Sequence, residues 1–183
     1  MDHSIERIRP LELEELGTFF KYLSVQLSEI NEEGSLLFQP VSRDNLRLPE
    51  EKKERFSKGL SVNVGQQGWR RAWVAISHRA EFVGHIDLRG HTEDHTKHRA
   101  LLGMGVSKNF RRRGLGKRLI ETAVYWSTAE TAIEWIDLWV LSNNTPALEL
   151  YRHTGFEQLG QVDDMFRIDG SSEGYILMTR KIQ

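Results

Sequence analysis

The chain has 183 residues, of which 39% are hydrophobic, and it contains no cysteine. This length and apolar content predict one domain over residues 1–183, and the lack of cysteine excludes disulfide scaffolds, cysteine-based zinc sites and thiol nucleophiles. Lys and Arg total 25 against 26 for Asp and Glu, so the formal net charge of −1 gives no general attraction to nucleic acid or membranes. The N-terminus is charged and lacks an apolar stretch, so we expect a cytoplasmic protein.

The N-terminal third is predicted to hold a short strand followed by two helices. Residues 5–9 could form the strand, and Pro10 ends it. A helix follows, because apolar residues recur at helical spacing at Leu13, Leu16, Phe20 and Leu23. Residues 31–45 are rich in turn formers, and Pro49 can open a second, charged helix that runs to about Ser57.

Three short apolar runs in the middle of the chain, at 72–77, 82–88 and 100–107, are predicted to be consecutive strands. Side chains alternate between the two faces of a strand. In the second run this places Phe82, Gly84, Ile86 and Leu88 on one face. The opposite face then carries Val83 with a titratable pair, His85 and Asp87.

The C-terminal part is predicted to alternate between helices and strands. A helical stripe that ends before Glu134 is formed by Leu115, Leu119, Ala123 and Trp126. We expect a strand at 135–141, a short helix at 146–153 that Gly155 closes, and final strands at 156–168 and 175–181. The strand, helix and strand from 100 to 141 form a crossover, which requires a parallel pair.

A strongly basic segment, 108–118, joins the third of the middle strands to the long helix. It carries six positive charges and no acid. Gly114 and Gly116 lie between an apolar run that ends at Val106 and a helix that starts near Leu115. Glycine lets the backbone approach a ligand closely, and the N-terminus of a helix attracts anions. The segment therefore predicts an anion site.

The glycine spacing excludes two common phosphate sites. A dinucleotide-binding turn needs a third glycine where this chain has Leu119. A triphosphate-binding loop needs a glycine where the chain has Arg111 and a Ser or Thr where it has Arg118.

The remaining pattern, Arg111-x-x-Gly114-x-Gly116, resembles the acetyl-coenzyme A signature of the GNAT superfamily of N-acetyltransferases. Residues 142–156 look like the second signature of that family, with Asn144, then Ala147, then Leu150-Tyr151, then Gly155-Phe156. Two motifs in the right order are more specific than either alone. The resemblance covers the predicted elements from residue 69 to the C-terminus, including an Asp169-Gly170 turn, and is thin over the first 65 residues.

The resemblance implies an α+β fold with a mixed, mostly antiparallel sheet of about seven strands and helices on both faces. A splayed parallel pair, 100–107 and 135–141, would bind acetyl-coenzyme A as acyl donor. The implied cofactor-binding residues are Met104, Gly105, Val106, Arg111, Arg112, Arg113, Gly114, Leu115, Gly116, Lys117, Asn144 and Tyr151. Simpler roles remain open: core packing for Met104 and Val106, and a helix N-cap for Asn144.

By the same resemblance, Tyr151 would protonate the leaving sulfur and the Val106 amide would hold the thioester carbonyl. The general base is less clear. N-terminal acetyltransferases of ribosomal proteins place a glutamate five residues before the Asn, where this chain has Trp139. Asp137, His85 and Asp87 are candidates that could act through water, with a salt bridge or an exposed polar face as the alternative for each. Trp139 could instead line the pocket of a small or cationic acceptor.

His91, His95 and His98 suggest a metal site only if they share a helix, and they fall in a loop between two strands. We therefore expect no metal.

Three functions remain open: transfer of an acetyl group to a primary amine, an acyl-coenzyme A-binding regulatory protein with little or no catalysis, and a nucleic-acid-associated factor. The first is favoured, with a small-molecule or peptide amine as acceptor and neither nucleic acid nor membrane as partner. Acids at Glu29, Glu32 and Glu33 could attract a cationic amine, and the chain could form a homodimer.

Overall fold

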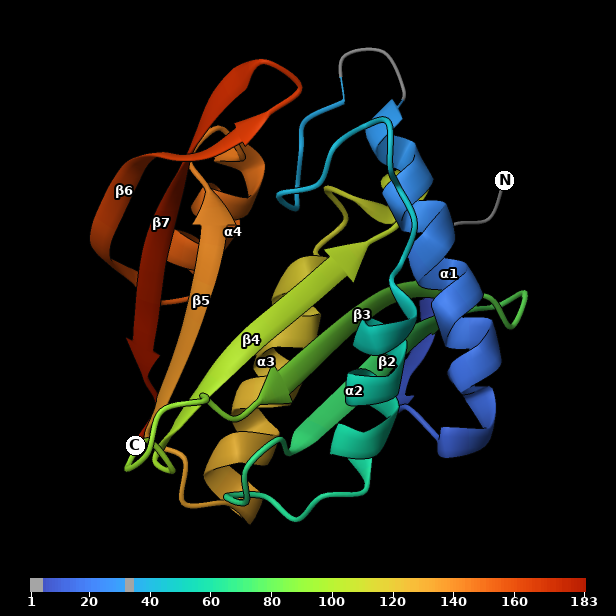
Figure 1. Ribbon diagram of the computed structural model, residues 1–183. Helices are drawn as coiled ribbons and strands as arrows, with labels where there is room; N and C mark the ends of the chain where they lie inside the picture. Colours follow the sequence, from blue (N-terminus) through green and yellow to red (C-terminus); the bar gives the residue numbers. More distant parts are fainter. Residues whose placement is uncertain (1–4, 32–34) are drawn as a thin grey trace.

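The structure is a computed structural model that describes residues 5–31 and 35–183. Its centre is one sheet with the strand order β1-β2-β3-β4-β5-β7-β6, shown in Figure 1. The strands are β1 (Ile5–Pro10), β2 (Arg70–Ser77), β3 (Phe82–Arg89), β4 (Arg99–Val106), β5 (Trp135–Leu141), β6 (Glu157–Ile168) and β7 (Ser171–Lys181). Within this sheet β4 and β5 pair in parallel and the other neighbours pair antiparallel.

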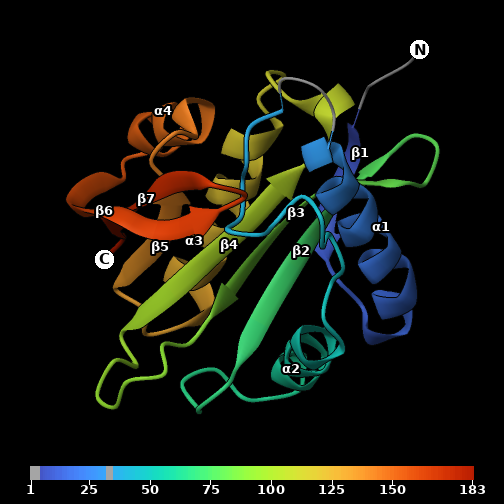
Figure 2. The ribbon, with the colours of Figure 1, turned by 45° about the horizontal axis from the view of Figure 1, so that its top comes forward.

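Helices cover both faces of the sheet, as the resemblance implied (Figures 1 and 2). On one face lie α1 (Leu16–Ser28) and α2 (Glu50–Leu60), which share a buried cluster with β2. On the other lie α3 (Leu115–Glu130) and α4 (Thr145–His153), which share the largest cluster with the middle strands. Short 3-10 turns at Leu13–Glu15, Glu29–Asn31 and Lys108–Phe110 complete the elements. In the described part of the chain, no helix combines the length and apolar character needed to cross a membrane.

The helical stripe predicted for α3 is the face that packs on the sheet. Leu115, Leu119 and Ala123 are at most 1% exposed. Trp126, one turn further on, is half-buried and meets Trp73 of β2 at a ring-centroid distance of 5.2 Å. The apolar spacing thus fixes which side of the helix faces the core.

The predicted alternation of β3 is correct from Gly84 onward and wrong before it. Gly84, Ile86 and Leu88 face α3, and His85 and Asp87 face the opposite side. Ala75 pairs with Gly84 and Ile76 pairs with Phe82, so Val83 is one extra residue, a β-bulge. The bulge exchanges the faces of the first two residues, so that Phe82 packs toward α1 and Val83 toward α3.

Two boundaries differ by three residues or more from those expected. The second helix continues to Leu60, one turn beyond Ser57. The last strand begins at Ser171 rather than at residue 175, because Asp169 and Gly170 both have positive φ, 49° and 81°, and close a two-residue hairpin. That geometry suits the right-handed twist of the flanking strands and is favoured by Asp-Gly.

The two parallel strands, β4 and β5, diverge after their first three paired residues. Hydrogen-bonded pairing joins Arg99–Leu101 of β4 to Trp135–Asp137 of β5, while β4 continues to Val106 and β5 to Leu141 (Figure 1). We call this divergence the β4–β5 opening. It is the splayed pair that the resemblance implied.

Candidate active site

The basic segment forms an exposed N-terminus for α3. Gly114 is the N-cap, with φ of 77°, and Arg112 is also left-handed, with φ of 56°. Gly114 has no side chain to cap the helix, so the amides of Leu115, Gly116 and Lys117 in its first turn remain available as donors. Together with the helix dipole and nearby cations, these amides suit an anion such as a phosphate.

The two glycines of the motif serve different purposes. A Cβ at Gly114 would meet nothing within 4 Å, so its role is the left-handed turn and an open approach to the backbone. A Cβ at Gly116 would lie 2.7 Å from Leu150 Cδ2, so this glycine lets α3 pack closely on α4. Leu115 is 1% exposed, so its side chain belongs to the core and it can offer a ligand only its backbone.

Arg112, Arg113 and Lys117 are exposed around this N-terminus, but Arg111 points elsewhere. Its Nε donates to the Val106 carbonyl at 2.8 Å, and its guanidinium forms an ion pair with Glu29. The other Glu29 oxygen accepts from the Lys108 amide at 3.2 Å. Arg111 therefore ties the end of α1 to the end of β4. Glu29 is engaged in this link, while Glu32 and Glu33 lie outside the described residues.

The end of β4 is covered by two polar residues of α1. Tyr22 donates its hydroxyl to the Gly105 carbonyl at 3.3 Å. With the Gln26 amide oriented so that its oxygen faces these donors, it accepts from the Val106 amide at 3.1 Å and the Ser107 amide at 3.2 Å. This oxygen also lies 2.8 Å from the Tyr22 hydroxyl, whose single proton serves either it or the Gly105 carbonyl. The amide predicted to hold a thioester carbonyl is thus engaged by Gln26, while the Met104 side chain packs against the core.

Sequence analysis missed Tyr22 and Gln26. They precede β4 by about 80 residues, and only the fold brings them to it. One signal was present: a glutamine four residues after a tyrosine lies on the same face of a helix, here beside its apolar stripe.

His85 is buried beneath α1. Its Nδ1 lies 3.2 Å from the Tyr22 hydroxyl, and the Phe19 ring meets the imidazole edge-on at 5.5 Å. Burial lowers the pKa of His85 to about 4, although the nearby Asp87 opposes this shift. The imidazole is therefore neutral at pH 7 and can act as a hydrogen-bond partner of Tyr22.

Asp87 lies two residues along the same face and shares its carboxylate between two arginines. Arg70 of β2 forms an ion pair with it, and Arg89 Nη1 approaches Asp87 Oδ1 to 3.4 Å. Asp87 and His85 both lean over β4, because a Cβ at Gly103 would lie 2.6 Å from Asp87 Oδ2 and one at Gly105 would lie 2.7 Å from His85 Cε1. The two β4 glycines bring these side chains to the β4–β5 opening.

Tyr151 and Asn144 lie at the other side of the site, on α4. Tyr151 is 8% exposed and packs edge-on against Phe156 at 5.7 Å. Burial raises the pKa of Tyr151 well above its usual value, so its phenol is protonated at neutral pH. Asn144 is the N-cap of α4 and accepts from the Ala147 amide at 3.4 Å, and its neighbour Asn143 donates to Glu173 at 2.6 Å.

Trp139 and Asp137 project from the same face of β5 and have different surroundings. Trp139 is 41% exposed and stacks on Tyr175 of β7 at 5.1 Å. Asp137 is 3% exposed and accepts from Arg99 at 2.6 and 2.8 Å and from Thr179 at 2.5 Å. Asp137 therefore has the salt-bridge role, and Trp139 is open to a ligand.

The histidines at 91, 95 and 98 lie in the loop between β3 and β4, as predicted. His91 Nε2 lies 3.0 Å from Asp137 Oδ2. Among the residues that the structure describes, His, Asp and Glu side chains do not gather in threes as a metal site requires.

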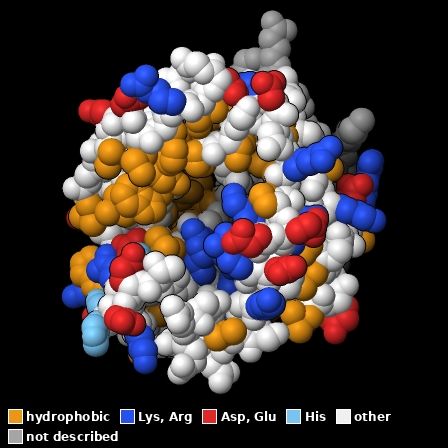
Figure 3. All heavy atoms as spheres, in the orientation of Figure 1, with side chains coloured by type: hydrophobic (Ala, Val, Ile, Leu, Met, Phe, Trp, Pro, Cys, Tyr) orange, Lys and Arg blue, Asp and Glu red, His pale blue; other side chains and the backbone are white. Residues whose placement is uncertain are grey.

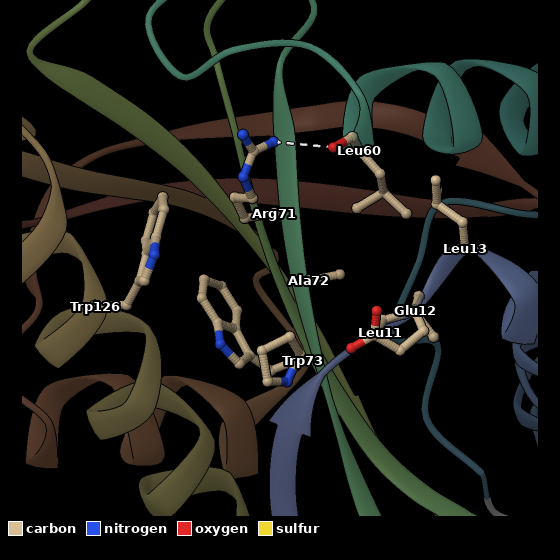
Figure 4. A pocket seen from close by; sticks show the side chains of 9 residues that line it. Leu11, Glu12, Leu13, Leu60, Arg71, Ala72, Trp73 and Trp126 are labelled. Carbon is tan, nitrogen blue, oxygen red and sulfur yellow. Dashed lines mark hydrogen bonds between the residues drawn. The ribbon is translucent and has the colours of Figure 1, made fainter.

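A pocket of about 260 Å³ lies apart from these residues, beside β1 and β2 (Figure 4). Trp73, Trp126, Arg71 and Leu60 are among its lining residues, and Arg71 donates to the Leu60 carbonyl at 3.2 Å. None of the predicted site residues lines this pocket, so it is distinct from the β4–β5 opening.

Comparison with protein families matches residues 41–156 to the acetyltransferase (GNAT) family. This match spans more than half of the chain, so the protein belongs to the GNAT acetyltransferase family. The family uses acetyl-coenzyme A as acyl donor, and membership indicates acyltransferase activity. Comparison with curated proteins gave no significant match.

Solved structures agree on the fold. A GNAT-family acetyltransferase from Streptococcus pneumoniae has a TM-score of 0.79 and 22% identity, covering 96% of this chain and 98% of its own. A ribosomal-protein-alanine N-acetyltransferase from Brucella melitensis has a TM-score of 0.76 and 15% identity over 96% and 99%. A mutant spermidine N-acetyltransferase from Vibrio cholerae has a TM-score of 0.69 and 18% identity over 97% and 95%. The names of these proteins span protein and polyamine acceptors, so likeness of fold leaves the acceptor open.

Proposed function

We propose that this protein transfers an acetyl group directly from acetyl-coenzyme A to a primary amine, with Tyr151 as general acid. The observation that carries the proposal is the pairing of an uncapped, basic α3 N-terminus with the β4–β5 opening in one site. The first suits the phosphates of coenzyme A, and the second suits its extended, amide-bearing arm.

The acyl donor supplies a thioester whose carbonyl carbon the amine nitrogen attacks. The carbonyl oxygen needs a donor at that moment, and the Val106 amide at the end of β4 is placed to serve once Gln26 releases it. When the carbon–sulfur bond breaks, the Tyr151 hydroxyl gives its proton to the sulfur. The amine nitrogen loses one proton as the amide forms, so the total number of protons does not change and Tyr151 can be reprotonated. No covalent intermediate with the protein is required.

The base that receives the amine proton has two candidates. Asp87 lies beside the opening, but Arg70 and Arg89 hold its carboxylate, which makes it an electrostatic partner of the site. His85 is neutral and reaches the Gly105 region through the Tyr22 hydroxyl. Burial holds the pKa of His85 at about 4, which makes it a weak base, so we assign an orienting role to both His85 and Asp87 and expect the proton that the amine loses to pass to solvent water at the opening.

A second candidate function is acyl-coenzyme A binding without turnover. Two observations favour it: Trp139 stands where ribosomal-protein acetyltransferases place a glutamate, and Gln26 engages the Val106 amide. Release of free thiol from acetyl-coenzyme A in the presence of an amine panel distinguishes the two functions.

The decisive variant is Tyr151→Phe, which removes one hydroxyl and keeps the ring. We expect kcat to fall by about 10²- to 10⁴-fold, the usual contribution of a general acid. Acetyl-coenzyme A affinity, measured by calorimetry, should change by less than about threefold, because the variant leaves the basic N-terminus of α3 intact. An unchanged kcat would remove Tyr151 from the mechanism.

A further inference from the structure

A cationic cluster lies on the α2-facing side of β2 and β3, beside the β4–β5 opening. Arg70 and Arg89 share the single carboxylate of Asp87, which leaves one uncompensated positive charge. The three side chains differ in access: the exposed fraction is 7% for Asp87, 18% for Arg70 and 36% for Arg89. The Arg70 guanidinium also lies over the Phe56 ring at 4.5 Å. Arg70 and Asp87 are therefore held in place by their neighbours, and Arg89 is the member of the cluster that a ligand can reach.

Arg89 reaches the place where β4 and β5 part. A Cβ at Gly103 would lie 3.2 Å from Arg89 Nη1, so the guanidinium lies over β4. Gly103 is two residues beyond Leu101, the last β4 residue that pairs with β5. The contact to Asp87 uses Nη1. Arginine has a fork of five N–H donors, so the partial exposure of Arg89 leaves donors accessible in the opening.

An aromatic wall faces this cation. Trp139 of β5 stacks on Tyr175 of β7, and burial raises the pKa of Tyr175 while the charge of Arg89 opposes that rise. The charge of Arg89 therefore interacts electrostatically with the Tyr175 hydroxyl on the same face of the sheet. Figure 3 shows Lys and Arg atoms gathered at the central hollow of this face, with Asp and Glu atoms beside them and a broad apolar area over the β5–β7 side.

The described acids on the bordering elements already have partners, and those of α2, which are Glu50, Glu51 and Glu54, pair with lysine or arginine of the same helix. Glu29, after α1, pairs with Arg111, and Asp137 of β5 pairs with Arg99. Glu173 of β7 accepts from Asn143. Asp87 of β3 has two arginines. A second positive charge on an acceptor would have to displace a partner that is already paired with one of these described acids. A negative group on the acceptor could instead pair with Arg89.

We propose that the acceptor is a small primary amine that also carries a carboxylate, and that Arg89 binds this carboxylate. This inference rests on the proposed acetyl transfer and names the substrate class of the same site. The guanidinium fork matches the two carboxylate oxygens and forms charge-assisted hydrogen bonds with them. The Trp139 and Tyr175 rings would contact the hydrocarbon part, and the carboxylate would hold the amine near the end of β4.

The test compares matched amines at fixed acetyl-coenzyme A by thiol release. Alanine and phenylalanine are each measured beside their carboxamides and their decarboxylated amines, and spermidine and a short peptide complete the panel. Rates are compared per unprotonated amine, because the carboxyl group changes the amine pKa. We expect kcat/KM for the carboxylates to exceed that for their neutral analogues by about ten- to hundredfold.

The variant Arg89→Gln should bring that ratio close to one, chiefly through a higher KM for the carboxylates, and should lower kcat/KM of the decarboxylated amines far less than that of the carboxylates. Arg89→Lys keeps the charge without the fork and should restore part of the preference. The matched control is Arg167→Gln, which removes an exposed arginine of β6 and should keep the full preference. Circular dichroism confirms that each variant is folded.

The outcomes separate this inference from the proposed function. Thiol release with no preference for a carboxylate, or with a preference that survives Arg89→Gln, overturns the inference and leaves acetyl transfer standing. Efficient turnover of spermidine alone has the same meaning. If no amine causes thiol release although acetyl-coenzyme A binds, the proposed function fails and the inference fails with it.

Discussion

At the scale of single residues, the site depends on polar groups that the fold keeps in one ionisation state. Tyr151 stays protonated and His85 stays neutral over a wider pH range than these side chains do in water, in both cases because burial disfavours the charged form. The arginines near the opening carry the charge instead. Positive charge is thus concentrated where an anion is expected, on the phosphate side and at Arg89.

The buried imidazole of His85 predicts a pH-dependent stability. Its pKa is about 4 in the folded protein against 6.5 as the ordinary value, so the unfolded chain binds more protons between these pH values. The stabilisation from the neutral imidazole is complete above about pH 6.5 and is lost as the pH falls toward 4. At most, about 3 kcal/mol is lost over this window.

The variant His85→Gln isolates this contribution, because glutamine can hydrogen-bond Tyr22 and does not titrate. Urea unfolding at pH 7 and pH 4.5 should show a larger drop in unfolding free energy for the natural protein than for the variant. The carboxylates titrate in both, so their contribution cancels. Equal drops would mean that the imidazole can become charged at little cost.

At the scale of elements, β4 depends on glycines that leave space for its neighbours. A Cβ at Gly105 would lie 2.5 Å from the side-chain amide of Gln26 and 2.7 Å from His85 Cε1, so α1 and β3 both approach the strand at this residue. The same closeness places Gln26 on the Val106 amide.

Gly105→Ala should therefore destabilise the protein by about 1–3 kcal/mol, the usual cost of overpacking. Gly160→Ala in β6 is the matched control, since a Cβ there would meet nothing within 4 Å, and it should change stability by less than about 0.5 kcal/mol. Denaturant unfolding of both variants provides the measurement. Similar unfolding free energies for the two variants would show that α1 can move away from Gly105 at little cost.

The elements also show what sequence alone can predict. The helix stripe of α3 follows from local spacing and the parallel β4–β5 pair follows from the order strand, helix, strand, so both are predicted closely, whereas the two-residue hairpin at Asp169-Gly170 starts β7 four residues before the predicted position. The bulge at Val83 follows from pairing with β2, which no local pattern records. The basic segment is contiguous in the sequence, so its spacing alone indicates an anion site. Tyr22 and Gln26 are far from Arg89 in the sequence, and only the folding of α1 onto β3 and β4 brings them together.

At the scale of the whole molecule, two parts of the sheet meet along a short seam. The strands β1 to β4 and β5 to β7 are joined by the parallel pairing at Arg99–Leu101 with Trp135–Asp137. Asp137 reinforces this seam, because Arg99 of β4 and Thr179 of β7 both donate to it and His91 lies 3.0 Å away. The β4–β5 opening begins where this seam ends.

Asp137→Asn should weaken the seam, since an amide cannot accept every bond that Arg99 and Thr179 donate. We expect a loss of about 1–3 kcal/mol in unfolding free energy; Arg99 is 25% exposed, so water compensates part of the broken pair. Asp164→Asn breaks an exposed pair with Arg167 and should have a much smaller effect. Urea unfolding at pH 7 measures both.

The pH dependence supplies an independent check of the seam. Burial alone would raise the pKa of Asp137, but hydrogen bonds from Arg99 and Thr179 outweigh it and hold the pKa below the ordinary value of 3.8. Its stabilisation is therefore present above pH 3.8 and is lost as the pH falls through the lower folded value. The difference in stability between the natural protein and Asp137→Asn should be constant from pH 5 to 7 and shrink below pH 4. A difference that persists undiminished at pH 2 would mean that packing, not ionisation of Asp137, holds the two parts of the sheet together.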